Sequence, residues 1–507
     1  MSAATSVRRT VLGTLLPGFM GTTLPGWVER MLREGLGGVC LFGENIVSAS
    51  QLRSLTSAIL AANPRALIAI DEEGGDVTRL HYDRGAPYPG NAVLGRLDDL
   101  AATGAVAARV GAELRAAGVN LDFAPDVDIN SNPLNPVIGI RSFGTEPAAV
   151  ARHSAAWVRG LQSQGVAASI KHFPGHGDTA QDSHLSLPTV DVPLEVLRSR
   201  ELLPFAAAVD AGALTVMTSH ILLPQLDAEH PATFSSVILQ GLLRGELGFD
   251  GVIVSDALDM VGASGTIGIP AAAVSALAAG CDLLCIGTKN TEEQLEQIVA
   301  RVEAALAAGE LEPARLADAQ ERLARLVARL AAAGPAAGSA PSATTPSAST
   351  PSPSLESAEG PDQRRVADSF AVDPEADALL RGPGWQFVRV DTAANIAVGV
   401  VPWGPFRALH DAGVHLVGQE VTEADWRERI EDIPESAYVL VIGKDNQRRP
   451  EVVALVDELR RRHPAVVTVD MGWPGDDSGY AQVATYGASA LVGSALAGFL
   501  ADRGVRS

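Results

Sequence analysis

One short segment of the 507-residue chain holds an unusual concentration of titratable side chains. Residues 171–184, KHFPGHGDTAQDSH, contain three histidines and two aspartates within 14 positions. Histidine and aspartate transfer protons near neutral pH and also bind metal ions. Pro174, Gly175 and Gly177 interrupt regular structure and favour a loop that folds back toward a ligand. The segment therefore predicts a functional loop rather than part of a packed core.

Further polar side chains stand where apolar, β-rich runs end. Asp71 follows the run 66–70, His220 follows 214–219, and Asp256 follows 251–255, while Lys171 and His172 lie at the end of 167–173. Each of them alone is equally well explained as a solvated strand end or a helix N-cap. Together they indicate one site at one end of a sheet.

The elements that would position these residues alternate between short apolar runs and Ala-rich helical stretches. Eight runs suited to buried strands precede residue 290, and this number fits an N-terminal (β/α)8 TIM-type barrel better than an open sheet. The expected strands are 11–16, 38–42, 66–70, 121–125, 167–173, 214–219, 251–255 and 282–287. In such barrels the working residues project from the carboxyl ends of the strands, where the polar residues above are found.

A change in composition separates two regions of the chain. Of the 28 residues from Gly334 to Pro361, 25 are Ala, Pro, Ser, Thr or Gly, which is typical of a linker. We therefore expect a catalytic barrel domain over 1–333, a linker over 334–361 and a C-terminal α/β domain over 362–507. Strands at 395–401, 437–443 and 465–472 and a helix at 450–463 predict a three-layer αβα sandwich for the last region.

Composition and charge exclude several classes of protein. Hydrophobic residues make up 47% of the chain, which is enough for large buried cores, and 39 Lys and Arg against 60 Asp and Glu give a net charge of −21. That charge has the wrong sign for nucleic acid or anionic membranes, so neither is expected as a partner. Three cysteines without paired spacing predict packed thiols. The apolar stretch after Arg8 and Arg9 is too short to span a membrane, so we expect a cytoplasmic protein.

Several motifs in order identify a resemblance to a known family. KHFPGHGDT (171–179) followed by DSH (182–184), with DEEGGDVTR (71–79) upstream and VSDALDM (254–260) downstream, resembles glycoside hydrolase family 3, and in particular its bacterial β-N-acetylglucosaminidases. The resemblance covers most of residues 10–330. It implies a retaining enzyme that forms a covalent glycosyl-enzyme intermediate.

The resemblance assigns the catalytic residues. Asp182 and His184 correspond to an Asp-His pair that acts as general acid and base, and Asp256 to the nucleophile. Residues two apart in an extended segment point the same way, so the Asp182 carboxylate can fix the His184 tautomer. The alternative for this pair is a hydrogen bond that only stiffens the loop.

The resemblance also assigns sugar-binding residues, which are Asp71, Arg79, Arg141, Lys171 and His172. An ion pair remains the alternative for Arg79, and a buried structural role remains the alternative for His172. Asp126 and His220, near strand ends, are candidates for supporting roles. No cofactor and no metal are implied.

The expected reaction is hydrolysis of terminal β-linked N-acetylglucosamine from peptidoglycan-derived fragments. Phosphorolysis of such a glycoside, or of a β-glucoside, is the first alternative, because an imidazole base does not repel phosphate as a carboxylate would. A metal-dependent barrel hydrolase using His172, His176, Asp178 and His184 is a second alternative, and a non-catalytic sugar-binding protein is a third. The sequence leaves open the aglycone, the choice between glucose and N-acetylglucosamine, the role of the second domain and the oligomeric state.

Overall fold

The computed structural model describes residues 3–181, 187–333, 360–392, 394, 396–412 and 417–506. Internal contacts divide the chain into two compact units. The barrel unit comprises Met1–Glu72, Leu100–Ile129 and Glu146–Glu359, and the C-terminal unit comprises Glu73–Asp99, Asn130–Thr145 and Gly360–Ser507. This division differs from the ranges expected from the sequence, because two segments from the first half of the chain pack with the last part.

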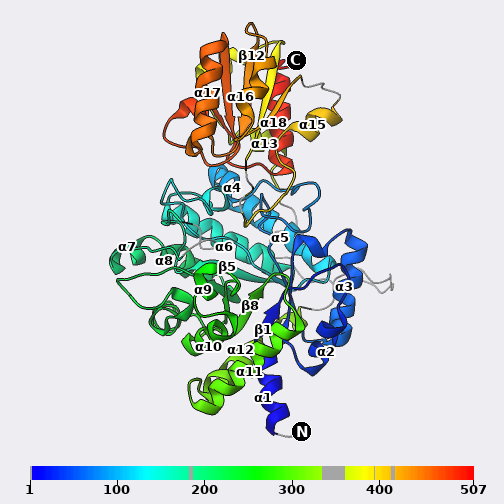
Figure 1. The fold of residues 1–507 in the computed structure, drawn as a ribbon, viewed down its shortest axis with the longest axis vertical. Helices are drawn as coiled ribbons and strands as arrows, with labels where there is room; N and C mark the ends of the chain where they lie inside the picture. The colour runs from blue at the N-terminus through cyan, green and yellow to red at the C-terminus, as the bar shows by residue number, and fades with distance from the viewer. Residues whose placement is uncertain are drawn as a thin grey trace, which may run out of the picture. The chain divides into compact units, whose positions relative to one another are not determined.

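The barrel unit contains one sheet of eight parallel strands that is nearly closed, in the order β1-β8-β7-β6-β5-β4-β3-β2 (Figure 1). This confirms the predicted (β/α)8 barrel. The strands are β1 (Leu15–Pro17), β2 (Gly38–Leu41), β3 (Leu67–Ile70), β4 (Leu121–Asp122), β5 (Ala167–Phe173), β6 (Thr215–Thr218), β7 (Val252–Ser255) and β8 (Leu283–Gly287). Every residue of these strands is buried, since helices cover the outer face and side chains fill the interior.

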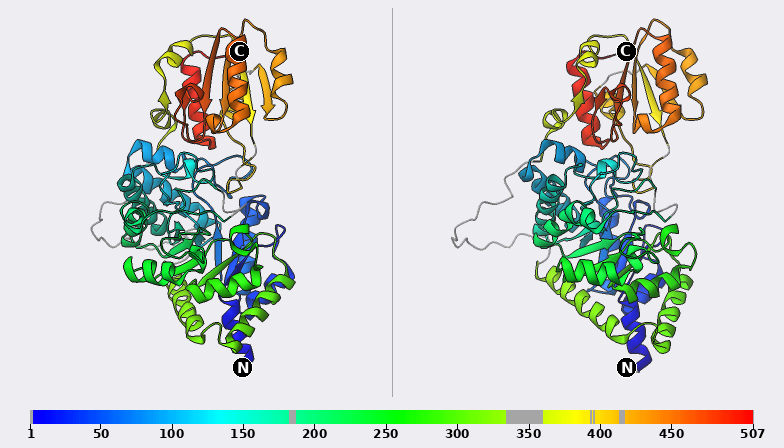
Figure 2. Two further views of the ribbon diagram at one scale, coloured as in Figure 1. Left: turned by 60° about the vertical axis from the view of Figure 1, so that its left-hand side comes forward. Right: turned by 90° about the vertical axis from the view of Figure 1, so that its left-hand side faces the viewer.

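Helices cover the outside of the barrel, as the two further views show (Figure 2). The longest are α3 (Ala49–Ala62), α5 (Leu100–Ala116), α6 (Pro147–Ser163), α11 (Glu292–Ala308) and α12 (Pro313–Ala332). Shorter ones are α1 (Ala3–Leu12), α2 (Gly26–Glu34), α7 (Leu194–Ser199), α8 (Leu202–Asp210), α9 (Val261–Ser264), α10 (Ile269–Ala279) and the π-helix Val237–Glu246. The three cysteines, Cys40, Cys281 and Cys285, are buried thiols, as predicted.

One expected barrel strand was misplaced. Val11 and Leu12, predicted as the start of a strand over 11–16, end helix α1 instead, and β1 begins only at Leu15. Both side chains are fully buried. A short apolar run fits a buried helical turn as well as a strand, so periodicity alone does not separate the two.

The C-terminal unit contains a six-stranded sheet in the order β11-β10-β12-β13-β14-β9, in which only β9 is antiparallel to its neighbour. The strands are β9 (Ala371–Val372), β10 (Trp385–Asp391), β11 (Gly418–Thr422), β12 (Tyr438–Gly443), β13 (Ala465–Asp470) and β14 (Val483–Ala484). Its helices are α4 (Asn91–Leu97), α13 (Gln363–Ala367), α14 (Pro374–Leu379), α15 (Phe406–Asp411), α16 (Trp426–Arg429), α17 (Pro450–Arg462) and α18 (Ala490–Asp502).

Alternate residues of β12 pack into two separate cores, one on each face of this sheet. Leu440 and Ile442 join the core that contains Leu496 of α18, while Val439 and Val441 join the core that contains Leu455 of α17. Side chains alternate between the faces of a strand, so this division produces the expected three layers. Val93 of α4 belongs to the first core, which explains why residues 73–99 pack with this unit.

The strand expected at 395–401 does not form in its described residues, 396–401, which adopt turns. Gly399 has a φ of 76°, which a strand does not use, and the Val400 N–H donates to the Tyr82 hydroxyl rather than to a neighbouring strand. The strand that forms in this part of the chain is β10, ten residues earlier, at Trp385–Asp391.

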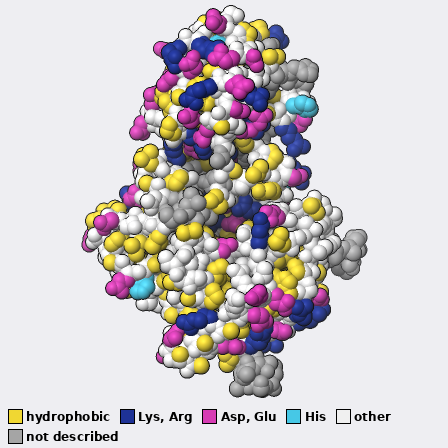
Figure 3. All heavy atoms as spheres, viewed as in Figure 1, with side chains coloured by type: hydrophobic (Ala, Val, Ile, Leu, Met, Phe, Trp, Pro, Cys, Tyr) yellow, Lys and Arg dark blue, Asp and Glu magenta, His cyan; other side chains and the backbone are white. Residues whose placement is uncertain are grey.

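Two further observations concern the surface and the helices. Acidic and basic side chains are interspersed on the face of the molecule shown in Figure 3. Within the described part of the chain, none of the helices combines the length and the apolar character that crossing a membrane requires.

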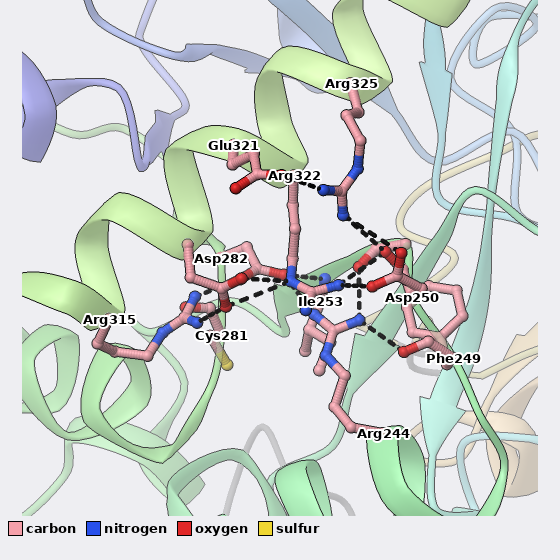
Figure 4. A network of polar contacts seen from close by, with 12 residues as sticks. Arg244, Phe249, Asp250, Ile253, Cys281, Asp282, Arg315, Glu321, Arg322 and Arg325 are labelled. Atoms are coloured by element: carbon pink, nitrogen blue, oxygen red, sulfur yellow. Dashed lines mark hydrogen bonds and ion pairs between the residues drawn. The ribbon is translucent and has the colours of Figure 1, made fainter.

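A buried charge network ties the start of β8 to the elements beside it (Figure 4). The Asp282 carboxylate, which is inaccessible to solvent, accepts hydrogen bonds from Arg244 at 2.7 Å, from Arg315, and from the Ile253 N–H at 2.9 Å. Burial raises the pKa of Asp282, although both guanidinium groups act in the opposite direction. The network therefore depends on all three partners being present together.

We expect Asp282→Ala to lower the free energy of unfolding by about 3–5 kcal/mol, because it leaves two guanidinium groups without their shared buried acceptor. Urea unfolding measures the change. The matched control is Asp250→Ala. Asp250 bonds Arg322, which is also shown in Figure 4, but the Asp250 side chain is 78% exposed. An exposed pair contributes about 1 kcal/mol or less. Equal losses in the two variants would contradict the argument.

Candidate active site

The polar residues predicted to form a site follow neighbouring strands of the barrel. Asp71 comes directly after β3, Lys171 and His172 lie near the end of β5, His220 lies two residues after β6, and Asp256 comes directly after β7. Strands β3 to β7 are parallel, and each is hydrogen-bonded to the next along the chain. Their carboxyl ends therefore share one rim of the barrel. The fold thus brings together residues that are up to 185 positions apart in the sequence.

Asp71 and Lys171 form an ion pair across the rim. Lys171 Nζ donates to Asp71 Oδ1 at 2.8 Å, and the Lys171 side chain is only 3% exposed while that of Asp71 is 20% exposed. A buried ammonium group requires such a partner. The pair presents a carboxylate acceptor and an ammonium donor in fixed positions, which is a suitable arrangement for binding adjacent hydroxyl groups.

His172 is oriented by a buried carboxylate that the sequence analysis missed. Asp128 Oδ2 lies 2.7 Å from His172 Nδ1, and Asp128 Oδ1 accepts the His176 N–H at 2.7 Å. The His172 N–H also points to this carboxylate, at 3.3 Å from each oxygen. An N–H at Nδ1 leaves Nε2 as the acceptor of the neutral ring.

The charge of Asp128 is stabilised by these donors. Burial alone would raise its pKa, but the hydrogen bonds from the His172 ring and from the His176 N–H lower it below the usual value. Asp128 therefore remains an anion and holds the turn after β5. The segment DFAPDVD contained the signal for it, since two acids at alternate positions follow the strand β4, but only Asp126 was selected.

His176 is a neutral, buried histidine. Its ring centre lies 5.8 Å from that of His172, and its Nδ1 lies 3.0 Å from Thr179 Oγ1. Burial lowers the pKa of His176 to about 4, and the proximity of His172 is the second cause of this shift. A histidine with this pKa does not exchange protons near neutral pH, so its role in this loop is structural.

We expect His176 to make the protein sensitive to acid. Its folded pKa, about 4, lies below the unfolded value of 6.5, so the unfolded chain binds the extra proton between these values and stability falls as the pH drops from 6.5 to 4. The largest loss is about 3 kcal/mol. Unfolding followed across this range should show a weaker pH dependence in His176→Gln than in the unchanged protein, and equal slopes would contradict the assignment.

Three of the residues suggested for a metal site, His172, His176 and Asp178, have other partners, and the fourth, His184, lies outside the described residues. Asp178 pairs with Arg200, and His176 Nδ1 contacts Thr179. A different group, Asp126, Asp128 and His172, has ligand-type atoms within 4.8 Å of one another. In this group, both oxygens of Asp128 are used by the donors of His172 and His176. The arrangement favours a hydrogen-bonded support for His172 over a metal centre.

Asp256 is half-buried at the end of β7, and hydrogen bonds fix the backbone at Asp256 and at the next residue. Its N–H donates to Thr218 Oγ1 at 3.3 Å, and the carbonyl of the next residue, Ala257, accepts from His220 Nε2 at 3.0 Å. Thr233 Oγ1 contacts both Thr218 Oγ1 and His220 Nδ1, at 2.8 and 2.9 Å. His220, predicted to have a supporting role, thus lies in the network that fixes the Asp256 backbone.

Arg79 and Arg141 belong to the C-terminal unit. Arg141 makes a two-point ion pair with Glu73, at 3.0 and 2.8 Å, and both side chains are almost fully buried. Arg79 donates to the carbonyls of Ala397 and Val398. The predicted acid-base pair, Asp182 and His184, lies outside the described residues.

Residues 26–326 match the family model described as the glycosyl hydrolase family 3 N terminal domain. The beta-hexosaminidase of Stenotrophomonas maltophilia (strain K279a) is 40% identical over 280 residues, which is 54% of this chain and 82% of that protein. Beta-hexosaminidase A of Pseudoalteromonas piscicida is 38% identical over 336 residues, which is 61% of this chain and 56% of that protein. The chain thus spans little more than half the length of this second relative.

A solved structure resembles nearly the whole chain. A glycoside hydrolase family 3 beta-N-acetylglucosaminidase from Paenibacillus sp. str. FPU-7 is 31% identical with a TM-score of 0.83, covering 98% of this chain and 96% of that one. The barrel with its polar rim, together with these relatives, defines a glycoside hydrolase. The chain belongs to glycosyl hydrolase family 3, as the motifs from residue 71 to residue 260 predicted.

Proposed function

We propose that the protein is an exo-acting, retaining β-N-acetylglucosaminidase that releases terminal N-acetylglucosamine from peptidoglycan-derived fragments. Family membership and the names of the relatives support the hydrolase and its sugar. The observation that carries the mechanism is the position of Asp256, directly after β7, with its backbone fixed by Thr218 and by the hydrogen bond from His220 to Ala257. A rigidly held carboxylate at the rim of a barrel is suited to nucleophilic attack.

In the first half of the reaction, an Asp256 oxygen attacks the anomeric carbon as the bond from that carbon to the leaving oxygen breaks. The His184 imidazolium gives its proton to the leaving oxygen, and the product alcohol departs. Asp182 accepts a hydrogen bond from the other ring nitrogen and stabilises the imidazolium. The sugar remains bound to Asp256 as a glycosyl ester.

In the second half, neutral His184 takes a proton from water while the water oxygen attacks the same carbon from the opposite face to the ester. The bond to Asp256 breaks, and the carboxylate and the imidazolium are restored. Two displacements at one carbon return the original β configuration.

The Asp71–Lys171 pair and the oriented ring of His172 provide hydroxyl-binding groups in this proposal, with Arg79 and Arg141 as further sugar-binding residues. The acceptor-donor pair at 2.8 Å supports this role, since adjacent sugar hydroxyls both donate and accept. The N-acetyl preference rests on the names of the relatives, because no residue contact identifies an acetamide pocket.

Comparing a chromogenic β-N-acetylglucosaminide with the matching β-glucoside, each with and without phosphate, tests the substrate and the reaction together. We expect faster release from the N-acetylglucosaminide, with free sugar of β configuration as the first product. Faster release from the glucoside would contradict the sugar assignment. Sugar 1-phosphate as the main product in phosphate buffer would replace hydrolysis by phosphorolysis.

A further inference from the structure

Arg200 connects the loop after β5 to the helices beside it. It lies in the turn between α7 and α8, and α8 packs against β5 (Figure 1). Arg200 Nη2 donates to Asp178 Oδ2 in the loop, and Arg200 Nε donates to Glu201 Oε1, each at 2.5 Å. The side chains of Arg200 and Asp178 are 27% and 25% exposed, and that of Glu201 is 1% exposed. Charge-assisted bonds that are shielded in this way contribute more than those of an exposed ion pair.

The guanidinium of Arg200 holds two different acids close together. Nε and Nη2 form the side of a guanidinium that usually binds both oxygens of one carboxylate, but here each of them binds a separate acid. Burial raises the pKa of Glu201 to about 7, and among the smaller causes Arg200 lowers it while Asp128 and Asp178 raise it. Without Arg200, therefore, Glu201 and Asp178 would repel each other, and the loop would be pushed away from α8.

The backbone of the loop passes directly over this ion pair. Gly175 has a φ of 128°, a conformation that glycine adopts readily, and a Cβ atom at this position would lie 2.8 Å from Glu201 Cβ. A Cβ atom on Gly177 would lie 1.6 Å from the Ile129 carbonyl oxygen. Residues 175–177 thus pack closely against two other segments of the barrel unit, and Arg200 holds the residue that follows them.

Asp178 is close in the sequence to the proposed acid-base pair. Asp182 follows it by four residues and His184 by six. Beyond the pair, the segment 188–190 exchanges two hydrogen bonds of 2.9 Å with Leu222, which attaches the chain to the region after β6. The ion pair at Asp178 is the attachment on the other side. A general acid must lie within hydrogen-bond reach of the leaving oxygen, and a misplacement of about 1 Å can cost about 10²-fold in rate.

We propose that Arg200 is a positioning residue for the acid-base pair and that it acts through Asp178. The inference rests on the proposed function, in which His184 gives a proton to the leaving oxygen and takes one from water. Loss of Arg200 should therefore impair proton transfer to the leaving group, whereas the attack by Asp256 itself needs no proton and should continue.

Two aryl β-N-acetylglucosaminides with different leaving groups test the proposal. A phenyl glycoside releases a phenol with a pKa of about 10 and needs the acid, whereas a dinitrophenyl glycoside releases a stable anion without a proton. We expect Arg200→Met to lower kcat/KM about 10²-fold for the phenyl glycoside but by less than about twofold for the dinitrophenyl glycoside. Arg200→Lys, which keeps the charge but not the two fixed donors, should recover part of the loss.

Two further variants calibrate the measurement. His184→Ala is the reference for a lost acid and should show the same selective loss in full. The matched control is Arg198→Met, because Arg198 lies on the adjoining helix α7 and makes a two-point ion pair with Glu246, at 2.7 Å for each bond, instead of with the loop. Arg198→Met should leave kcat/KM unchanged for both glycosides.

The comparison of variants separates the possible outcomes. Equal losses for both glycosides in Arg200→Met would show that Arg200 only stabilises the fold and would overturn the proposal. A selective loss in His184→Ala without one in Arg200→Met would count against this inference alone. If His184→Ala shows no selective loss, the acid-base assignment of the proposed function fails and the inference fails with it. If Arg200→Met does not fold, Asp178→Asn decides in its place, because it removes the loop's charge at a partly exposed position and leaves Arg200 bonded to Glu201.

Discussion

Replacing Asp256 with alanine is expected to lower kcat/KM for a chromogenic β-N-acetylglucosaminide by about 10⁴-fold or more, the scale seen when an enzyme loses its nucleophile. Without this carboxylate the glycosyl ester cannot form, and the reaction loses its first displacement. The barrel itself should remain folded, because Asp256 is half-buried at the rim and its N–H keeps its hydrogen bond to Thr218, although the variant loses the bond from the Ala257 N–H to Asp256 Oδ1 at 2.7 Å.

Added azide provides the positive control for this variant. A small anion can occupy the space of the missing carboxylate and attack the anomeric carbon directly, which yields an azide of inverted configuration and restores turnover. Asp259→Ala is the matched comparison, because the Asp259 carboxylate accepts the Thr288 N–H and is not the nucleophile in our proposal. Retention of more than a few per cent of activity by Asp256→Ala would contradict the assignment of the nucleophile.

The barrel was predictable because its strands are buried on both faces and therefore read as continuous apolar runs. Seven of the eight runs contain their strand, and the run 167–173 matches β5 at both ends. The run at 11–16 failed because an apolar helix end and a short strand look alike in one sequence. In the expected strand 395–401, the described residues 396–401 adopt turns around Gly399, because an apolar composition alone does not fix the backbone dihedral angles.

The composition of the chain predicts a linker, but it did not predict the full extent of the C-terminal unit. Residues 73–99 and 130–145 pack with that unit in the structure. The reason lies in long-range packing, since Val93 joins a core made of residues after 360 and Arg448 donates to the Asn135 carbonyl. Contacts across about 300 residues leave no local pattern in the sequence.

The sequence likewise predicted some residues of the candidate site and missed others. Asp71, Lys171 and Asp256 could be found because each is a charged residue where an apolar strand ends. Asp128 was missed because its role depends on three donors from residues 172–176, which only the fold brings to it. Sequence motifs thus predict the polar residues at the strand ends. The groups that orient these residues are identified only from interatomic distances in the structure.

Asp128→Asn is therefore expected to impair both folding and catalysis. Asparagine has nearly the same shape, but it carries no charge and only one acceptor oxygen, so it cannot satisfy the donors of His172 and His176 together. We expect the free energy of unfolding to fall by about 3–5 kcal/mol, as for a broken buried charge network. Misplacement of the His172 ring should lower kcat/KM by about 10²-fold.

The pH dependence distinguishes this charge effect from a loss of packing. The pKa of Asp128 is lowered in the folded protein, so its contribution to stability is complete above the unfolded value of 3.8 and is lost as the pH falls through the lower folded value. The stability difference between the unchanged protein and Asp128→Asn should thus be largest near neutral pH and shrink below about pH 3.8. Asp83→Asn, at a side chain that is 77% exposed, should show no such difference. A gap that stays constant down to low pH would mean that Asp128 acts through its shape, and the orientation of His172 would then need another cause.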